Sequence, residues 1–321
     1  MSAGGATPRV TLGLPVFNGE CFLAESIKAL LAQTYTNFEL VISDNGSTDR
    51  TPEIAQEFAD VDPRIRYVRH PNNRGSAFNH NFVVRAARGE FFKWVSDDDL
   101  YAPDLVQRCV DALDARPEIV LAHAWTAFIN ETGTVTNHVV YPLATDVPRP
   151  SQRFRSVLYE QGGDDIYGVI RTSVMRRVAP YGSYHMPDRT IVAELCLYGR
   201  FHNIPEYLYL RRDHPGRIDR VAPSMRLRSA RLDPRRGNRW RHPAVRLVGE
   251  YLGAYLLAIW RAPISLPERF RCTGHLLGWL MRHADPLHKR KLLKSADPAI
   301  RALGTRSLAF RLSMKWRALN R

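Results

Sequence analysis

The sequence predicts an α/β fold built around a mostly parallel sheet, followed by a basic α-helical extension. Three observations lead to this prediction: strand and helix patterns alternate over the first two hundred residues, polar clusters follow three of the strands, and positive charge is concentrated near the C-terminus. Strands separated by helices of this length are joined by right-handed crossovers and therefore run parallel. In such sheets, ligands bind beyond the carboxyl ends of the strands.

The first elements can be assigned in chain order. An apolar run at Val10–Phe17 predicts a buried strand, and Glu20–Gln33 has apolar residues at helical spacing. The cycle then repeats with a strand at Phe38–Ser43, a helix that opens near Pro52, a strand at Ile65–His70, a helix at Ser76–Arg88 and a strand at Glu90–Val95.

Length and composition allow one large domain with an appendage. The 321 residues are 45% hydrophobic, and we place the boundary so that residues 1–215 form the body and 216–321 a basic helical region.

The four cysteines lie far apart without metal-ligand spacing, which favours reduced thiols in the cytoplasm. The start of the chain lacks the apolar core of a signal peptide, and no apolar run is long enough to predict a membrane span.

Charge is distributed unevenly along the chain. Residues 1–210 hold 20 Lys+Arg against 25 Asp+Glu, whereas residues 211–321 hold 26 against 7. Within the basic part, Ala244–Trp260, Glu268–His283 and Ser307–Arg321 interleave arginines with apolar residues at helical spacing. This arrangement favours peripheral binding to the anionic inner face of the cytoplasmic membrane, and nucleic acid is not expected because it would not use the apolar faces. The alternative is a helical subdomain packed on the body with its arginines in solvent.

Acidic residues follow two of the predicted strands. Asp44 begins a loop of small polar residues, which predicts either a site for a base or ribose or an ordinary Asx turn. Asp97, Asp98 and Asp99 follow an apolar strand, where adjacent carboxylates repel one another unless they bind a cation or are well hydrated. Oxygen ligands favour Mg²⁺ or Mn²⁺, and Mg²⁺ uses one or two protein carboxylates together with phosphate oxygens. A helix cap from Asp97 or Asp99 would account for one aspartate of the three.

Several motifs occur together in a specific order. They read LPVFNGECFLAESIKALLAQTY from Leu14, FELVISDNGSTDRT from Phe38 and IRYVRHPNNRGSAFNHNFVVRAARGEFFKWVSDDD from Ile65. This ordered set resembles the inverting nucleotide-sugar glycosyltransferases of family 2, which have the GT-A fold, a Rossmann-like sheet flanked by helices. The resemblance extends from about Val10 to about Pro215. One departure is Ser96, where many relatives begin the acidic motif with another aspartate.

The resemblance implies which residues contact the donor. Asp44 would bind the base and Asp97 the ribose, while Asp98 would ligate the divalent metal that bridges the diphosphate. The remaining donor contacts implied by the resemblance come from two loops: Pro15, Phe17 and Asn18 in the first, and Asn73, Arg74 and Gly75 in the second.

The second half of the chain should supply the acceptor side and the general base. Asp188 is the candidate base by the resemblance, although it could instead cap the helix that follows it. Asp164 and Asp165 are the reserve candidates, or part of a plain turn. Arg211, Arg212 and His214 follow a strand-like segment and could neutralise the diphosphate or, for His214, complete the metal shell. The alternative for the two arginines is a surface salt-bridge cluster.

Together these features predict a metal-dependent inverting glycosyltransferase that moves a hexosyl or deoxyhexosyl group. The resemblance favours UDP or dTDP sugars as donors and a saccharide or lipid-linked acceptor in cell-envelope synthesis. The competing hypothesis is a catalytically silent protein that binds a nucleotide or glycan and uses its basic tail to hold nucleic acid or lipid. A nucleotidyltransferase is disfavoured because the first loop lacks a glycine-rich, basic phosphate motif.

Overall fold

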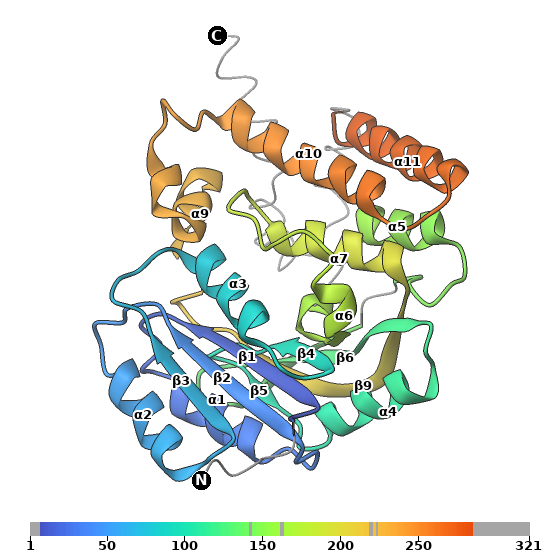
Figure 1. Cartoon of the computed structure of the whole chain (residues 1–321). Helices are drawn as coiled ribbons and strands as arrows, with labels where there is room; N and C mark the ends of the chain where they lie inside the picture. Colours follow the sequence, from blue (N-terminus) through green and yellow to red (C-terminus); the bar gives the residue numbers. More distant parts are fainter. Residues whose placement is uncertain (1–6, 141–142, 161–163, 218–220, 223, 285–321) are drawn as a thin grey trace.

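The structure is a computed structural model that describes residues 7–140, 143–160, 164–217, 221–222 and 224–284 (Figure 1). Its centre is a single mixed sheet in the strand order β3-β2-β1-β4-β8-β6-β9-β5, with β7 paired to β6. The strands are β1 (Val10–Val16), β2 (Phe38–Asp44), β3 (Ile65–Arg69), β4 (Phe91–Trp94), β5 (Leu100–Tyr101), β6 (Ile119–Ile129), β7 (Val135–Val139), β8 (Val169–Arg171) and β9 (Arg200–Arg212).

Helices cover both faces of this sheet. They are α1 (Leu23–Leu31), α2 (Thr51–Val61), α3 (Ser76–Ala86), α4 (Leu105–Ala115), α5 (Pro150–Tyr159), α6 (Thr172–Met175), α7 (Pro187–Tyr198), α9 (Met225–Leu232), α10 (Ala244–Arg261) and α11 (Leu266–Ala284), with short 3₁₀ turns η1 (Asp165–Tyr167) and η2 (Pro234–Gly237). One apolar cluster joins the sheet to α1, α2 and α4, and a second joins it to α3, α5, α7, α10 and α11.

The first half of the chain follows the predicted order closely. β1, β2, β3 and β4 pair in parallel, and each predicted strand and helix is present with ends shifted by at most a few residues. The strands β1 and β2 are buried almost throughout because helices lie on both of their faces. The predicted α/β class with a mostly parallel sheet is therefore confirmed.

The second half mixes directions. β8 lies antiparallel between β4 and β6, whereas β9 runs parallel to β6 along most of its length. At its far end β9 pairs with the short β5, which comes directly after the three aspartates. This pairing brings the end of β9 to the loop that follows β4.

The C-terminal helices pack on the body. α10 contacts α7, α11 contacts α5, and both lie at the end of the molecule farthest from α2 (Figure 1). Tyr251, Tyr255 and Ile259 of α10 are buried in the same apolar cluster as α7. The helix predicted at Ser307–Arg321 lies outside the described residues.

This packing predicts that α10 contributes to the stability of the whole body. Ile259→Ala, at a fully buried position, should lower the free energy of unfolding by about 2–5 kcal/mol through lost burial and a cavity. Leu257→Ala, two residues away but 62% exposed, is the matched control and should change it by less than about 0.5 kcal/mol. Urea unfolding of both variants checks this, and equal effects would show that α10 does not pack as described.

Candidate functional site

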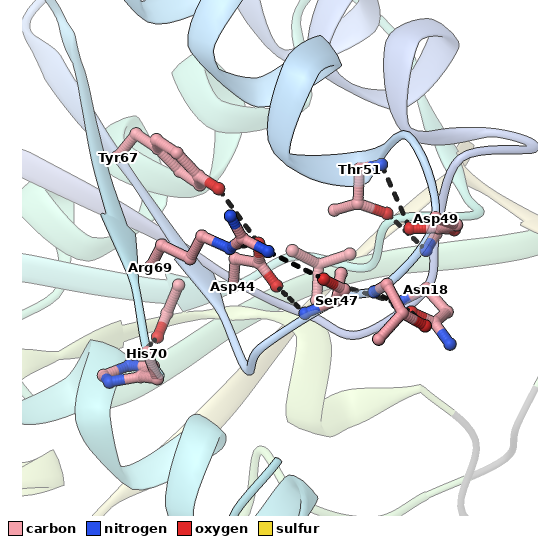
Figure 2. A network of polar contacts seen from close by, with 12 residues as sticks. Asn18, Asp44, Ser47, Asp49, Thr51, Tyr67, Arg69 and His70 are labelled. Atoms are coloured by element: carbon pink, nitrogen blue, oxygen red, sulfur yellow. Dashed lines mark hydrogen bonds and ion pairs between the residues drawn. The ribbon is translucent and has the colours of Figure 1, made fainter. Parts of the chain in front are cut away.

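The loops after β1 and β2 are joined by hydrogen bonds into one surface. The backbone N–H of Asn18 donates to Ser47 Oγ at 2.9 Å, and Asn18 Oδ1 accepts from the backbone N–H of Thr48 at 2.9 Å (Figure 2). Asn18 adopts a left-handed φ of 55°, which is uncommon for a residue other than glycine and is often found at functional sites. Phe17, beside it, is 42% exposed, and Pro15 is half-buried at the end of β1.

Gly19 brings the first loop against the acidic cluster. Its N–H donates to Thr51 Oγ1 at 2.8 Å, so Thr51, the first residue of α2, holds the loop. A Cβ at position 19 would lie 2.2 Å from Asp97 Oδ2 and would collide with that carboxylate. Only glycine therefore lets the loop after β1 approach Asp97 this closely.

Asp44 organises the loop that follows β2. Its side chain is fully buried; Oδ1 accepts from the backbone N–H of Ser47 at 2.8 Å and Oδ2 accepts from the Tyr67 hydroxyl at 2.9 Å (Figure 2). Arg69 lies 3.7 Å from the same Oδ2. The Asx-type turn is thus present, and base binding by Asp44 stays a prediction.

The loop after β3 forms one wall of a cavity of about 590 Å³. Asn73 Oδ1 accepts from Asn45 Nδ2 at 2.9 Å, and the Arg74 guanidinium lies over the Phe78 ring at 3.8 Å. Gly75, with φ 90°, is buried against the backbone of Leu232 at the end of α9. The cavity is lined by these loop residues and by residues from later in the chain, among them Asn73, Arg74, Tyr181, Ser183, Asp233 and Arg235.

The three consecutive aspartates have three different environments. Asp99 is buried; its Oδ1 accepts from the backbone N–H of Arg212 at 2.8 Å, and its Oδ2 accepts from the Tyr209 hydroxyl. Burial, together with the charge of Asp98, raises the pKa of Asp99 to about 7. For Asp97, the same two causes raise the pKa to about 8. The helix-cap alternative is wrong for Asp99, because α4 begins at Leu105 and Asp99 bonds to β9 instead.

Asp98 meets His214 across the site. Asp98 Oδ2 and His214 Nε2 are 2.9 Å apart, and Asp98 Oδ1 accepts from the Ser96 hydroxyl. Burial opposes ionisation of Asp98, but the hydrogen bonds from His214 and Ser96 outweigh it and hold its pKa below the ordinary value. The structure thus brings together the two residues predicted as metal ligands, and Ser96 supports Asp98.

Arg212 connects β9 to the acidic loop from within the protein. It has no exposed surface; its Nη2 pairs with Glu25 at 2.7 Å, its Nε donates to the Asp98 carbonyl at 2.8 Å, and its Nη1 donates to the Glu131 carbonyl at 2.6 Å. The surface-cluster alternative is therefore wrong for Arg212. Its guanidinium positions the backbone of Asp98, and contact with a diphosphate stays a prediction.

Arg211 points to the other side of β9. It pairs with Asp164 at 2.7 Å, and Asp164 also accepts from the Thr126 hydroxyl at 2.9 Å. Asp165 is buried, 3.5 Å from His123 Nε2. Asp164 is thus held by neighbouring side chains, whereas Asp165 Oδ1 has no hydrogen-bond partner within the described part of the chain.

Asp188 lies in the first turn of α7, half-buried. Burial raises its pKa, although the positive charges of Arg189 and Arg211 and backbone N–H groups at the start of the helix act in the opposite direction. Met186, two residues earlier, has a left-handed φ of 54°. Asn18 and Met186 are the two non-glycine residues of the described chain with positive φ. Asn18 is a predicted donor contact, and Met186 lies two residues before the predicted base Asp188.

The donor types at Asp98 and His214 fit a divalent cation. A carboxylate oxygen and an imidazole nitrogen are ordinary ligands for Mn²⁺, and two protein ligands suffice when a diphosphate supplies the others. Within the described part of the chain, no group of three or more His, Cys, Asp or Glu side chains is arranged to hold a metal by itself. The site is therefore suited to a cation shared with a ligand rather than to a closed protein cage.

Some residues of the site had no signal in the sequence. Asp233 and Arg235 line the cavity beside Asn73 and Arg74, although they lie in the Arg-rich segment assigned to the extension. Tyr67 and Tyr209 hold Asp44 and Asp99 from other strands. Only strand pairing brings these two tyrosines to the aspartates, and no pattern in the sequence indicates that pairing.

The chain matches a known protein family. The family model described as glycosyl transferase family 2 matches residues 11–182, more than half of the chain. An uncharacterized glycosyltransferase of Haemophilus influenzae is 32% identical over 126 residues, which cover 39% of this chain and 50% of that protein. The chain therefore spans about half the length of this curated relative.

Solved structures share the fold. S. aureus TarS 1–349 in complex with UDP superimposes with a TM-score of 0.61 at 15% identity, over 91% of this chain and 76% of that one. The mannosyltransferase PcManGT from Pyrobaculum calidifontis, in complex with GDP-Man and Mn²⁺, does so with a TM-score of 0.54 at 18% identity, over 97% and 88%. At these identities the likeness concerns the fold, and it confirms the GT-A architecture.

The raised pKa of Asp188 predicts a cost to stability. A carboxyl whose folded pKa exceeds its ordinary value of 3.8 adds stability at acid pH, and this stability is lost as the pH rises through the folded pKa. Asp188→Asn should therefore be at least as stable as the native chain at pH 7, and its advantage should shrink as the pH falls toward 3.8. Urea unfolding across this range measures the effect, with the exposed Asp111→Asn as control. A variant that is less stable than the native chain at pH 7, or whose advantage over it grows as the pH falls, would contradict the prediction.

Proposed function

The chain belongs to glycosyl transferase family 2, and we propose that it transfers a sugar, with inversion, from a nucleoside diphosphate sugar to a saccharide or lipid-linked acceptor. The observation that carries the proposal is the meeting of Asp98 and His214 at 2.9 Å beside Asp97. These residues come from opposite halves of the chain, and their approach forms a polar site at the carboxyl ends of the parallel strands.

The donor would lie along the joined loops after β1, β2 and β3. Phe17 and Asn18 are exposed there, and Asn73 and Arg74 line a cavity of a size typical for small-molecule sites. Asp97, against Gly19, would face the ribose. The TarS complex contains UDP, which supports a uridine donor for this chain as well.

Asp98 and His214 would hold a divalent cation, Mg²⁺ or Mn²⁺. When bound, this cation neutralises charge on the diphosphate and so makes it a better leaving group. The protein's own part is to orient Asp98: Ser96 bonds to its carboxylate, and Arg212 holds its backbone carbonyl. The PcManGT complex contains Mn²⁺, which supports this assignment.

Asp188 would act as the general base. Its carboxylate would take the proton of the acceptor hydroxyl as that oxygen bonds to the anomeric carbon and the bond to the diphosphate breaks on the opposite face. A pKa raised by burial makes the carboxylate a stronger base than an exposed aspartate. The charge of Arg211 reaches Asp188, so Arg211 would help to keep it ionised.

The cation site is tested by Asp98→Asn. The variant keeps the size of the side chain but loses the negative oxygen, so divalent ion should no longer strengthen UDP binding. His214→Asn should raise the Mn²⁺ concentration required by about tenfold or more. Calorimetric titration with UDP, with Mn²⁺ or with chelator, measures both, and Asp111→Asn serves as the charge-matched control. Equal UDP affinity of the native chain with and without the ion would refute the cation site.

Removal of the base is tested by Asp188→Asn. Transfer should fall by roughly two to four orders of magnitude while UDP affinity stays within about twofold, because asparagine cannot accept the proton. The readout is UDP release from UDP-sugars with a panel of saccharide acceptors, and the native product should have inverted configuration by NMR. Near-native turnover in the variant, or a retained configuration, would exclude Asp188 as the base.

A further inference from the structure

The outward sides of α10 and α11 are apolar. On α10 the residues facing away from the body are Val245, Gly249, Gly253, Leu256 and Trp260, and on α11 they are Leu266, Phe270, Gly274, Leu277 and Met281. Both rows have the spacing 4-4-3-4, which places their members on one side of an α-helix. Each helix therefore has a buried apolar side against α7 or α5 and a second apolar side in solvent.

The two rows form one surface. α10 and α11 are in contact, and the rings of Trp260 and Phe270 meet edge to face with centroids 6.0 Å apart. Exposure is high across it: Val245 is 78% exposed, Phe270 64% and Met281 69%. Leu257 (62% exposed) adjoins the same surface, which we call the α10–α11 face. A contiguous exposed row of large apolar side chains marks an interaction site.

Positive charge borders this face. Residues 225–284 contain twelve arginines and no lysine against three acidic residues. Arg246, Arg261, Arg271 and Arg282 follow the apolar rows on the two helices, and their side chains are exposed. The first three also pair with glutamates, namely Glu250, Glu194 and Glu268, so the excess of positive charge rests on the count of arginines over acidic residues. The chain that continues beyond α11, residues 285–321, carries ten further Lys and Arg against two Asp. An apolar face bordered by cations complements an anionic lipid surface.

No helix of the described chain is both long enough and apolar enough to cross a bilayer. The geometry instead matches helices that lie in the plane of the interface. We propose that the α10–α11 face docks on an anionic membrane, with Leu257, Trp260, Phe270, Leu277 and Met281 among the acyl chains and the bordering arginines at the headgroups. Trp240, between Arg239 and Arg241 in the loop before α10, is also exposed (81%).

Two of the three segments expected to bind the membrane form this face. Ala244–Trp260 and Glu268–His283 correspond to α10 and α11, which are part of the body, and Ser307–Arg321 lies outside the described residues. The α10–α11 face begins at Val245, shortly after Leu232–Arg235, which lines the cavity. Docking would therefore hold the cavity near the lipid surface.

The test uses the full chain and the paired substitution Leu257→Glu with Phe270→Glu. Both positions are exposed, so the variant should fold and bind UDP as the native chain does. The native chain should co-sediment with phosphatidylcholine vesicles that contain about a third phosphatidylglycerol, and bind pure phosphatidylcholine about tenfold less. The paired variant should bind the anionic vesicles about tenfold less or weaker still, because two apolar contacts are replaced by charges that anionic lipid repels.

The control is Val61→Glu, which introduces one of the two negative charges of the paired variant at a 78% exposed valine at the end of α2, on the opposite end of the molecule (Figure 1). It should bind vesicles like the native chain within about twofold. Native-like vesicle binding by the paired variant, or loss of binding by Val61→Glu to the same extent, would overturn the proposal. A third outcome would also overturn it: the native chain is a dimer in sedimentation velocity, the paired variant is a monomer, and neither binds vesicles. The face would then join two copies of the chain. Binding of single-stranded nucleic acid in place of vesicles would overturn it as well. UDP binding is measured in parallel and does not depend on the outcome.

Discussion

The burial of one guanidinium group holds the site together. Arg212 lies at the end of β9 with no exposed surface, and a charge in that position is tolerated only when its donors are satisfied. Glu25 of α1 supplies the counter-charge, and the carbonyls of Asp98 and Glu131 accept its remaining bonds. Since Arg212 cannot leave these partners, the chain that follows it must pass beside the acidic loop, and His214 comes to Asp98.

The same constraint explains how three adjacent carboxylates coexist. Asp99 turns inward and accepts hydrogen bonds from β9, Asp98 is held by Ser96 and His214, and Asp97 lies against the bare backbone of Gly19. Only Asp98 has its pKa lowered by these contacts. A run of identical residues is thus divided by tertiary contacts into one internal anchor, Asp99, and two half-buried groups, Asp97 and Asp98.

The C-terminal helices α10 and α11 stabilise the body and carry the face proposed to dock on a membrane. α10 and α11 bury one side against α7 and α5, so they are part of the folded body, and the first turn of α7 contains the half-buried Asp188. Their opposite sides remain apolar and are bordered by arginines. The two alternatives considered for this region, packing on the body and docking on lipid, are therefore compatible, since each uses a different side of the same helices.

The sequence by itself determined the parallel half of the fold, because alternation of apolar strands with amphipathic helices is a local pattern that reports burial directly. It also predicted Asp98, through its resemblance to the family, and His214 as metal ligands, and the structure places these two side chains 2.9 Å apart. Only the tertiary structure decided that Arg212 is internal, that Asp99 bonds to β9 and that Asp233 and Arg235 reach the cavity. These outcomes depend on pairing between strands and packing of helices far apart in the chain, such as β5 with β9 and α9 with α3, and no local periodicity encodes such contacts.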